Sequence, residues 1–416
     1  MKHRKNRSLS RREFVKTTAA AAVAGAFPHV ARGQASDKPI RVGLIGCGGR
    51  GTGAAQDAVA ADPNVRIVAL ADVFKDRIES CRSTLKDKAR QDIDEKLCFT
   101  GLDAYQKVLE VDLDYVILAT PPYYRPEQFT AAIAAGKHVF MEKPVAVDPV
   151  GVRTMLAAGQ EADRKGLCVV AGTQRRHQPQ YIETIKRIHD GAIGEIRAAQ
   201  CYWNMGQLWY RKREPGWSDL DWMIRDWVNW TWLSGDHIVE QHVHNIDVIN
   251  WVLGKHPTEV VAMGARHRRV TGDQYDCFAA DFTYPDHVHL LSMCRQINGC
   301  ANEVSERVIG TKGVSNCNGW ISGQPPIEIK GNPYVLEHKD LIDAIRAGKH
   351  LNETQNVTHS TMCAIMARMS AYTGQKVTWD EAMKSDLRLG PPDYELTEEN
   401  IAAGVIKAHV KVPGKP

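Results

Sequence analysis

Hydrophobic positions in the first half of the chain follow two different periods in turn. Short apolar runs, as expected for strands buried on both faces of a sheet, lie at residues 40–45, 65–70, 115–119, 138–141 and 167–171. Between them, apolar residues recur with helical spacing, most clearly over 76–89, 127–135 and 149–165. This alternation predicts a doubly wound parallel sheet of the α/β class, with right-handed crossover connections.

The second half of the chain predicts a different sheet. Strand patterns occur at residues 196–203, 259–265, 276–284, 287–295 and 307–310, and helical patterns at 334–347 and 357–373. We therefore predict a first domain over 36–147 and a second α+β domain over 148–383. Residues 148–171 of the second domain should return to the first sheet, and residues 384–416 form a polar tail.

A glycine-rich turn follows the first predicted strand. Gly46, Gly48 and Gly51 have the spacing G-x-G-x-x-G, which permits a tight turn, close backbone approach to a pyrophosphate, and close helix packing. The helix expected from about Thr52 would direct free N–H groups and its positive dipole end at the phosphates. With a strand before it and a helix after it, this turn predicts a Rossmann dinucleotide site. The loop residues expected to contact the cofactor are Gly46, Cys47, Gly48, Gly49, Arg50 and Gly51.

Asp72 ends the second predicted strand, about 20 residues beyond the last glycine of the turn. A carboxylate at this place binds the adenine ribose hydroxyls and repels a 2′-phosphate. NAD is therefore favoured over NADP as the cofactor, although Lys75 and Arg77 could soften that repulsion.

The first 35 residues have the pattern of an export signal. Residues 10–16, Ser-Arg-Arg-Glu-Phe-Val-Lys, resemble the twin-arginine motif S-R-R-x-F-L-K, and a short, weakly apolar stretch follows to Phe27. Small residues at Gly33 and Ala35 offer a cleavage site after Ala35. We expect residues 1–35 to be a signal peptide that engages the twin-arginine translocon, so the mature protein is periplasmic or otherwise exported.

Composition narrows the function classes. The chain has 416 residues, with 43% hydrophobic and 25% charged residues, as is ordinary for a globular enzyme of two domains. The net charge of +4, with no basic stripe beyond the N-terminus, argues against nucleic-acid binding. No apolar run reaches the ~20 residues that span a membrane, so no stable membrane insertion is expected. The ten cysteines include no C-x-x-C pair, which argues against a zinc ribbon or redox dithiol.

Three more motifs accompany the glycine loop. Thr120-Pro121-Pro122 ends one predicted strand, Glu142-Lys143-Pro144 ends the next, and residues 244–254 have the spacing His-x-x-Asp-x-x-x-Trp-x-x-Gly. Together these motifs resemble the Gfo/Idh/MocA oxidoreductases, over about residues 40–380. The resemblance implies a Rossmann domain followed by a C-terminal α/β domain with an open mixed or antiparallel sheet. That sheet often mediates dimers or tetramers, so we expect a homo-oligomer.

The resemblance places the chemistry on Lys143 and His244. Oxidation of an alcohol by NAD needs a base for the hydroxyl proton and a positive group for the oxygen. Family members use this lysine in substrate binding and proton relay. His244 is the predicted base because imidazole titrates near neutrality, and Glu240 would orient it where typical members have aspartate. The competing structural interpretations are an ion pair between Lys143 and Glu142 and a core imidazole bonded to backbone.

His242 departs from the family pattern, in which this position is small and often glycine. Glu240, His242 and His244 alternate, so an extended segment would put all three on one face. With His237 nearby, that spacing would suit zinc or a similar ion, but an extra histidine can equally bind substrate hydroxyls. We predict no metal and keep a metal site as an open alternative.

The remaining candidates come from strand ends and from an aromatic region. Eight of the ten tryptophans lie between Trp203 and Trp251, where their faces suit sugar C–H groups, although several must pack inside the fold. In related sequences a Trp-Arg element here touches the cofactor. The further cofactor candidates are Thr120, Pro121, Glu142, Lys143, Gln174 and Arg225. The substrate candidates are Lys143, Arg176, His177, Tyr181, Trp222, His242 and His244.

These observations predict an exported NAD-dependent oxidoreductase that acts on a pyranose, glycoside or polyol. Since little free NAD exists outside the cytoplasm, the cofactor should be held tightly and regenerated in place. The first alternative is a redox-neutral NAD-dependent glycosidase. The resemblance implies that such an enzyme oxidises C3 transiently, eliminates the aglycone and returns the hydride. A non-catalytic sugar-binding protein is the second alternative, against which intact Lys143 and His244 argue.

Overall fold

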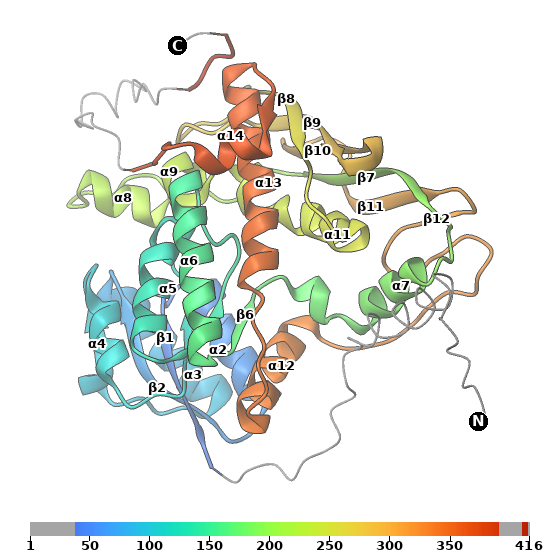
Figure 1. Ribbon diagram of the computed structural model, residues 1–416. Coiled ribbons are helices and arrows are strands. Elements are labelled where there is room, and N and C mark those ends of the chain that lie inside the picture. Colours follow the sequence, from blue (N-terminus) through green and yellow to red (C-terminus); the bar gives the residue numbers. More distant parts are fainter. Residues whose placement is uncertain (1–37, 391–409, 415–416) are drawn as a thin grey trace, which may run out of the picture. The chain divides into compact units, whose positions relative to one another are not determined.

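The computed structural model describes residues 38–390 and 410–414 (Figure 1). The predicted signal peptide, residues 1–35, and most of the predicted tail lie outside the described residues. In the part of the chain that is described, no helix is both long and apolar enough to cross a membrane.

Six parallel strands form the first sheet, in the order β3-β2-β1-β4-β5-β6. They are β1 (Ile40–Ile45), β2 (Val65–Asp72), β3 (Cys98–Thr100), β4 (Tyr115–Leu118), β5 (His138–Met141) and β6 (Val169–Ala171). The chain order reverses between β1 and β4, and ligands of such sheets bind outside the strand carboxyl ends at this switch point. The predicted doubly wound parallel sheet is confirmed.

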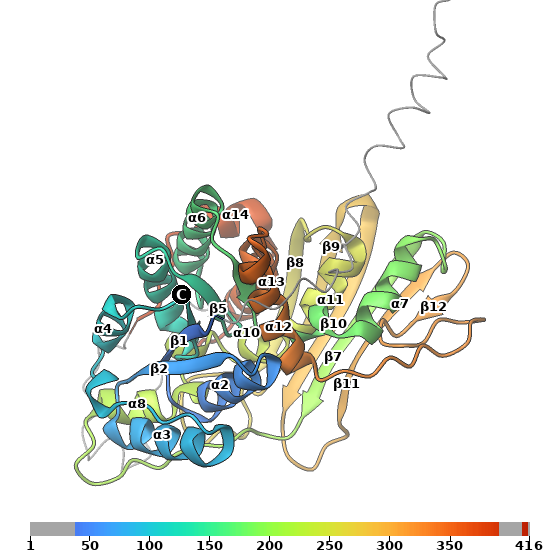
Figure 2. The same cartoon turned by 90° about the horizontal axis from the view of Figure 1, so that it is seen from below.

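Helices cover both faces of this sheet (Figure 2). One face packs against α2 (Gly49–Ala61), α3 (Lys75–Ala89) and α12 (Pro333–Ala347). The other packs against α4 (Ala104–Glu110), α5 (Arg125–Ala134) and α6 (Pro149–Lys165). Short 3-10 helices η1 (Glu95–Leu97), η2 (Pro122–Tyr124) and η3 (Gln174–His177) fill the connections. The start of α6 is set by Asp148, which accepts the Gly151 N–H at 2.7 Å, and its end by left-handed Gly166.

Seven strands form the second sheet, in the order β12-β11-β7-β10-β9-β8-β13. They are β7 (Ile196–Met205), β8 (Glu259–Ala265), β9 (Cys277–Tyr284), β10 (Val288–Gln296), β11 (Glu303–Gly310), β12 (Val314–Ser315) and β13 (Val377–Thr378). Only the pair β7 and β10 is parallel among the pairings of these described strands, so the sheet is mixed, as predicted.

One long helix joins the two sheets. α13 (Thr354–Thr373) packs against α6 of the first layer and against β8 of the second, and a single apolar core runs through both (Figure 1). The other helices of this half are α7 (Pro179–His189), α8 (Asp219–Arg225), η4 (Trp227–Asn229), α9 (Thr231–Ser234), α10 (His237–Glu240), α11 (Val243–Leu253), η5 (Pro285–His287) and α14 (Trp379–Lys384).

One local prediction is wrong. Residues 239–244 do not form an extended segment, because Glu240 ends the short helix α10 and His244 lies in the first turn of α11. The alternation of polar residues suggested an extended segment. The backbone instead forms a helical turn, in which the N–H groups of Val239 and Glu240 donate to the Asp236 carbonyl. The helix after the glycine turn also begins earlier than expected, at Gly49.

Candidate active site

The glycine turn is shaped by two close backbone approaches. Gly46 follows β1 with a φ of +100°, and a Cβ there would lie 2.6 Å from the carbonyl carbon of Ala119. A Cβ on Gly51 would lie 1.8 Å from the Gly46 oxygen. The first turn of α2 can therefore pack against the loop only because residue 51 has no side chain. A Cβ on Gly48 or Gly49, by contrast, would meet nothing within 4 Å.

A cleft of about 420 Å³ opens over this turn. The N-terminus of α2 borders it, and Gly48 caps that helix without any side-chain hydrogen bond, which leaves its first N–H groups available to an anion. Predicted cofactor residues that line the cleft are Gly46, Gly48, Gly49, Arg50, Gly51, Asp72, Thr120, Pro121 and Arg225. Open backbone above a helix N-terminus fits a pyrophosphate, so these residues fit a dinucleotide.

Asp72 lies at the carboxyl end of β2, where a ribose is expected. Its two oxygens accept the N–H groups of Cys47, at 2.7 Å, and Phe74, at 2.9 Å. Burial raises the pKa of this carboxyl, and the two N–H groups counter that rise. The carboxylate thus fixes the glycine turn as well as facing the cleft, a task that the sequence motif alone does not reveal.

Side chains of α5 hold the turn at Thr120-Pro121 in place through hydrogen bonds. The buried Arg125 guanidinium donates twice to the Thr120 carbonyl, at 3.0 and 2.7 Å, and the Thr120 hydroxyl donates to Gln128 at 2.6 Å. Burial lowers the pKa of Arg125 to about 10. Pro121 therefore projects into the cleft from a rigid corner at the end of β4.

Lys143 meets Glu240 and His244 from a distant part of the sequence, whereas Glu240 and His244 lie on the consecutive helices α10 and α11. Lys143 follows β5, and its ammonium donates to the Glu240 carboxylate at 3.1 Å and to the Glu240 carbonyl. The side chains of Lys143 and Glu240 are 10% and 9% exposed, so the ion pair lies at the edge of the interior. The competing interpretation, a bridge from Lys143 to Glu142, is not what the structure has: Glu142 accepts instead from Arg50 at 2.5 Å.

The His244 imidazole lies beside this ion pair and stacks on Trp203, with 5.6 Å between ring centroids. Burial, followed by the positive charges of Lys143 and Arg175, lowers its pKa well below 6.5. His244 is therefore neutral at physiological pH and free to accept a proton. No hydrogen bond from the ring of His244 to backbone occurs in the described residues, unlike the core-histidine alternative.

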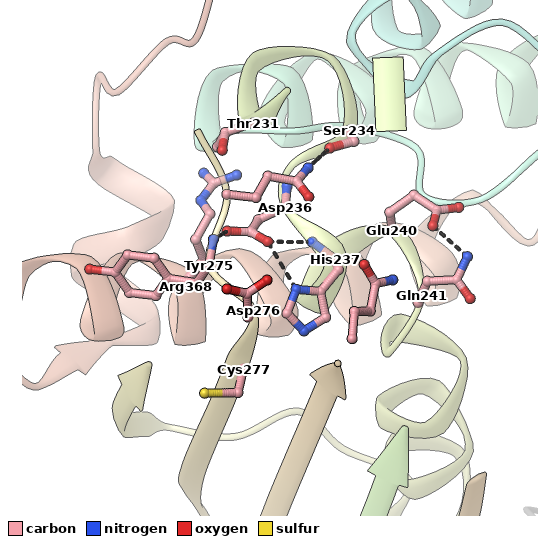
Figure 3. Close-up of polar contacts among 12 residues, drawn as sticks. Thr231, Ser234, Asp236, His237, Glu240, Gln241, Tyr275, Asp276, Cys277 and Arg368 are labelled. Carbon is pink, nitrogen blue, oxygen red and sulfur yellow. Dashed lines mark hydrogen bonds and ion pairs between the residues drawn. The ribbon is translucent and has the colours of Figure 1, made fainter. Parts of the chain in front are cut away.

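A buried polar network holds the helix that carries Glu240 (Figure 3). Asp236 has a φ of +76° and accepts the His237 N–H at 2.5 Å and the Tyr275 N–H at 3.1 Å. Arg368 donates to the carbonyls of Gly235 and Val147, at 2.8 and 2.7 Å, and so ties this turn to the first domain. The turn that leads to Glu240 is thereby held by residues from both domains.

Two predicted substrate residues are engaged in buried contacts of their own. Arg176 forms a two-pronged ion pair with Asp247 at 2.8 and 2.9 Å. His177 lies between Asp340 and Glu353, at 2.6 and 3.3 Å, which raise its pKa to about 10 against the effect of burial. The carboxylates around Arg176 and His177 balance the positive charges of these two side chains without a substrate. Their roles in substrate binding therefore stay predictions.

Tyr181 belongs to a cluster that the sequence did not single out. Its hydroxyl donates to Glu306 at 3.1 Å, and Glu306 also pairs with Arg175 and accepts from Asn245 at 2.6 Å. Arg175 in turn lies over the Trp203 ring, 5.7 Å from its centroid, next to His244. Arg175 and Glu306 were missed because one lies on a 3-10 turn and the other on a strand 131 residues away.

His242 and Trp222 are both buried away from the cleft. His242 shares its Nε2 with Ser292, at 2.7 Å, and burial lowers its pKa to about 3. Trp222 donates to the Arg211 carbonyl at 2.7 Å and packs on Trp230. Within residues 38–390 and 410–414, no group of three or more His, Cys, Asp or Glu is arranged to hold a metal ion.

Of the two remaining cofactor candidates, Arg225 lines the cleft and Gln174 does not. Gln174 approaches Tyr334 at 3.5 Å, while Arg225 lines the cleft and pairs with Asp76. Further cleft residues were not predicted from the sequence: Phe74, Arg77, Trp209, Arg211 and Trp227. The high density of tryptophans in this part of the sequence indicated a functional region. The sequence did not distinguish Trp209 and Trp227, which line the cleft, from tryptophans that pack inside the fold.

Two stretches of the chain match models of one protein family. Residues 40–172 match the family described as oxidoreductase family, NAD-binding Rossmann fold, and residues 181–315 match the GFO/IDH/MocA C-terminal domain.

Individual relatives are more distant. Inositol 2-dehydrogenase of Rhizobium meliloti is 27% identical over 226 residues, which are 54% of this chain and 58% of that protein. The 2,7-anhydro-N-acetylneuraminate hydratase of Mediterraneibacter gnavus is 28% identical over 181 residues, 42% of this chain and 44% of that protein. The chain thus spans less than two thirds of the length of these curated relatives.

A solved structure agrees over more of the chain. Scyllo-inositol dehydrogenase from Lactobacillus casei, with bound NAD(H) and scyllo-inositol, has a TM-score of 0.63 at 18% identity. The match covers 82% of this chain and 99% of that one. At this identity the likeness shows the fold.

Proposed function

From the premise that the chain belongs to the Gfo/Idh/MocA family, we propose that it is an exported NAD-dependent oxidoreductase of a CH–OH group in a pyranose, glycoside or polyol. The observation that carries the proposal is the ion pair of Lys143 and Glu240 with His244 nearby, at the end of β5. This strand is the neighbour of β4, whose end borders the cleft at Thr120 and Pro121. The inositol dehydrogenase relative supports a polyhydroxylated ring as the substrate class.

The cofactor fits the residues present. The backbone over Gly48 and Gly49 would hold the pyrophosphate, Asp72 the adenine ribose, and the Thr120-Pro121 corner the nicotinamide half. NAD, when bound, supplies the acceptor for the hydride of the alcohol carbon. The negative charge of Asp72 would repel the 2′-phosphate of NADP, so this residue favours NAD.

The chain itself supplies the proton chemistry. His244 takes the hydroxyl proton, since the lowered pKa of its imidazole leaves the ring unprotonated at neutral pH. The Lys143 ammonium, held by Glu240, polarises the same oxygen as negative charge develops on it. Glu240 thereby positions Lys143 directly, rather than orienting His244 as a triad carboxylate would, since its carboxylate accepts from Lys143 and Gln241.

The redox-neutral alternative keeps one observation in its favour. A hydratase is among the relatives, and a hydratase reaction by its name carries no net oxidation. The same Lys143 and His244 would serve transient oxidation at C3 followed by elimination. A release assay on nitrophenyl glycosides without added NAD separates the two: release of nitrophenol without accumulation of NADH favours the alternative, and net NADH formation favours the oxidoreductase.

Export is supported by the twin-arginine pattern at residues 10–16. An exported enzyme would keep its NAD through each cycle, because no pool of free cofactor surrounds it. Changing Arg11 and Arg12 together to Lys should retain the protein in the cytoplasm, as followed by cell fractionation. Unchanged delivery to the periplasm would contradict export by this route.

A homo-oligomer is supported by the second sheet. Val261 and Met263 of β8 and Leu291 and Met293 of β10 are 54%, 70%, 40% and 38% exposed on its outer side. Such an apolar face suits burial against a second copy in a dimer or tetramer. Light scattering on the wild type and on Met263→Glu tests this: the proposal expects a dimer or tetramer that dissociates in the variant, and a monomeric wild type would contradict it.

The test of the main proposal uses the purified protein and a panel of pyranoses, glycosides and inositols. Reduction of NAD should occur with at least one of them and should disappear in His244→Ala. Binding of NAD by a wild type that reduces it with none of these compounds, and that releases no aglycone, would favour the non-catalytic alternative.

A further inference from the structure

Residues 206–230 leave the second sheet after β7 and reach the cofactor cleft before the chain returns at α9. We call this segment the clasp. Its cleft-lining side chains are Trp209, Arg211, Ile224, Arg225 and Trp227. We propose that the clasp holds the adenosine half of NAD and slows its release, an inference that rests on the proposed use of NAD.

The clasp is braced internally. Ser218 and Asp221 form a capping box at the start of α8, and Arg213 donates to the Trp217 carbonyl at 3.0 and 2.8 Å. The buried Asp226 accepts the Arg211 N–H at 2.7 Å and the Thr271 hydroxyl at 2.8 Å. A segment tied in this way presents its cleft side chains in a fixed arrangement.

Two contacts fasten the clasp to the first domain on either side of the cleft. On one side, Arg225 pairs with Asp76 of α3 at 2.7 and 3.0 Å and lies over the Phe74 ring, 3.7 Å from its centroid. On the other, the aromatic cluster that contains Trp222, Trp230 and Trp232 packs on Tyr123 and Tyr124 of η2. Both walls of the cleft are therefore joined through one segment of the second domain.

The position of the Arg225 contact identifies the half of the cofactor concerned. Phe74 and Asp76 follow Asp72, and the carboxyl end of β2 is where the adenine ribose binds. Trp209, with 46% of its surface exposed, packs edge-on against Trp227, and both tryptophans line the cleft. Aromatic faces and guanidinium groups together suit a base and its phosphates.

The contact between Arg225 and Asp76 can be broken without touching the cleft lining, because Asp76 does not line it. Asp76 is 60% exposed in its pair with Arg225, and Asp190 is 62% exposed in its pair with Lys186 on α7. Asp190→Ala is therefore a matched control for Asp76→Ala. The measurement is the rate at which preloaded NADH leaves the protein on a chase with excess NAD, followed by energy transfer from tryptophan.

We expect Asp76→Ala to raise the release rate about 2- to 5-fold, the scale of one exposed ion pair. Arg225→Ala should raise it about 10-fold or more, since the contact with Phe74 is lost as well. Both should weaken ADP-ribose binding by a similar factor and leave nicotinamide mononucleotide binding unchanged. Asp190→Ala should behave as wild type.

Equal release rates in wild type, Asp76→Ala and Arg225→Ala would overturn the clasp while leaving the proposed function intact. Weaker nicotinamide mononucleotide binding with unchanged ADP-ribose binding would also overturn it, since the contact would then be with the other half. A wild type that binds no NAD(H) at millimolar concentration would overturn both proposals.

Discussion

The two halves of the proposed active site are built in different ways. The cofactor half is mostly backbone: glycines whose absent side chains make room, a helix N-terminus, and one carboxylate that fixes the turn. The substrate half is made of side chains, with Lys143 and Glu240 97 residues apart in sequence and Trp203 stacked on His244. The difference suggests that substitutions in the first half act on binding and folding, and those in the second on turnover.

The largest effect is expected in the substrate half. His244→Ala and Lys143→Ala should each lower turnover by about 10²-fold or more, the usual scale for a lost acid–base group. NAD binding should persist, because neither residue borders the glycine turn. Steady-state kinetics beside a direct NAD titration measures both quantities. Near-normal turnover in either variant would move the chemistry elsewhere, with Tyr181 and His177 the next candidates.

In the cofactor half, two glycines should behave oppositely. Gly51→Ala places a Cβ against the Gly46 carbonyl and should destabilise the fold by about 1–3 kcal/mol, as overpacking does. Gly48→Ala meets nothing in the protein, so its thermal stability should match wild type while NAD binding weakens, because the new methyl lies where the pyrophosphate approaches. Thermal melts with and without NAD distinguish the two. Equal stability losses would contradict the assignment of Gly48 to ligand approach.

Asp72→Ala should weaken NAD binding by about 10-fold, through loss of the ribose contact and of the bond to the Cys47 N–H. Discrimination against NADP should relax at the same time, since the repelling charge is gone and Arg77 remains nearby. Titrations of both cofactors against both proteins measure this. A wild type that binds NADP more tightly than NAD would show that Asp72 does not set the preference.

The last prediction concerns the dependence of stability on pH. The pKa of His177 is raised to about 10 by Glu353 and Asp340, so its ion pairs stabilise the fold fully below its unfolded pKa of about 6.5. That contribution should fade as the pH rises from there toward 10. Urea unfolding across this range should show a stability slope that His177→Gln lacks. An identical slope in both proteins would mean that His177 is neutral in the fold.

The glycine turn and Asp72 could be located from the sequence because their determinants are local, whereas Cys47, Glu142, Lys143 and Gln174 do not line the cleft. The spacing of Gly46, Gly48 and Gly51, and the distance to Asp72, follow from consecutive turns of one βαβ unit. For the substrate half, the motifs named Lys143 and His244, but not their geometry. The partners Arg175 and Glu306, and the tie from Arg368 to the turn at Gly235, depend on long-range packing that no local pattern encodes.

The fold shows the same division. Five of the six strands of the parallel sheet, and helices α3, α5 and α6, were predicted to within a few residues, because each is a clear periodic run between turns. Short elements such as β3, β12 and β13 were missed, since two or three residues carry no periodicity. The alternation of Glu240, His242 and His244 does not form a strand, because Glu240 closes a helical turn bonded to the Asp236 carbonyl and His244 lies in the first turn of α11.

The central claim is that this protein holds NAD and reduces it with His244 as the base. The most direct measurement is a single turnover: the protein is purified without added cofactor, oxidised, and mixed with the sugar and inositol panel while the absorbance of reduced nicotinamide is followed. We predict a signal close to one equivalent per chain in the wild type, and a loss of about 10²-fold or more in its rate in His244→Ala. Absence of bound nucleotide in the wild type, or an unchanged rate in His244→Ala, would contradict the account.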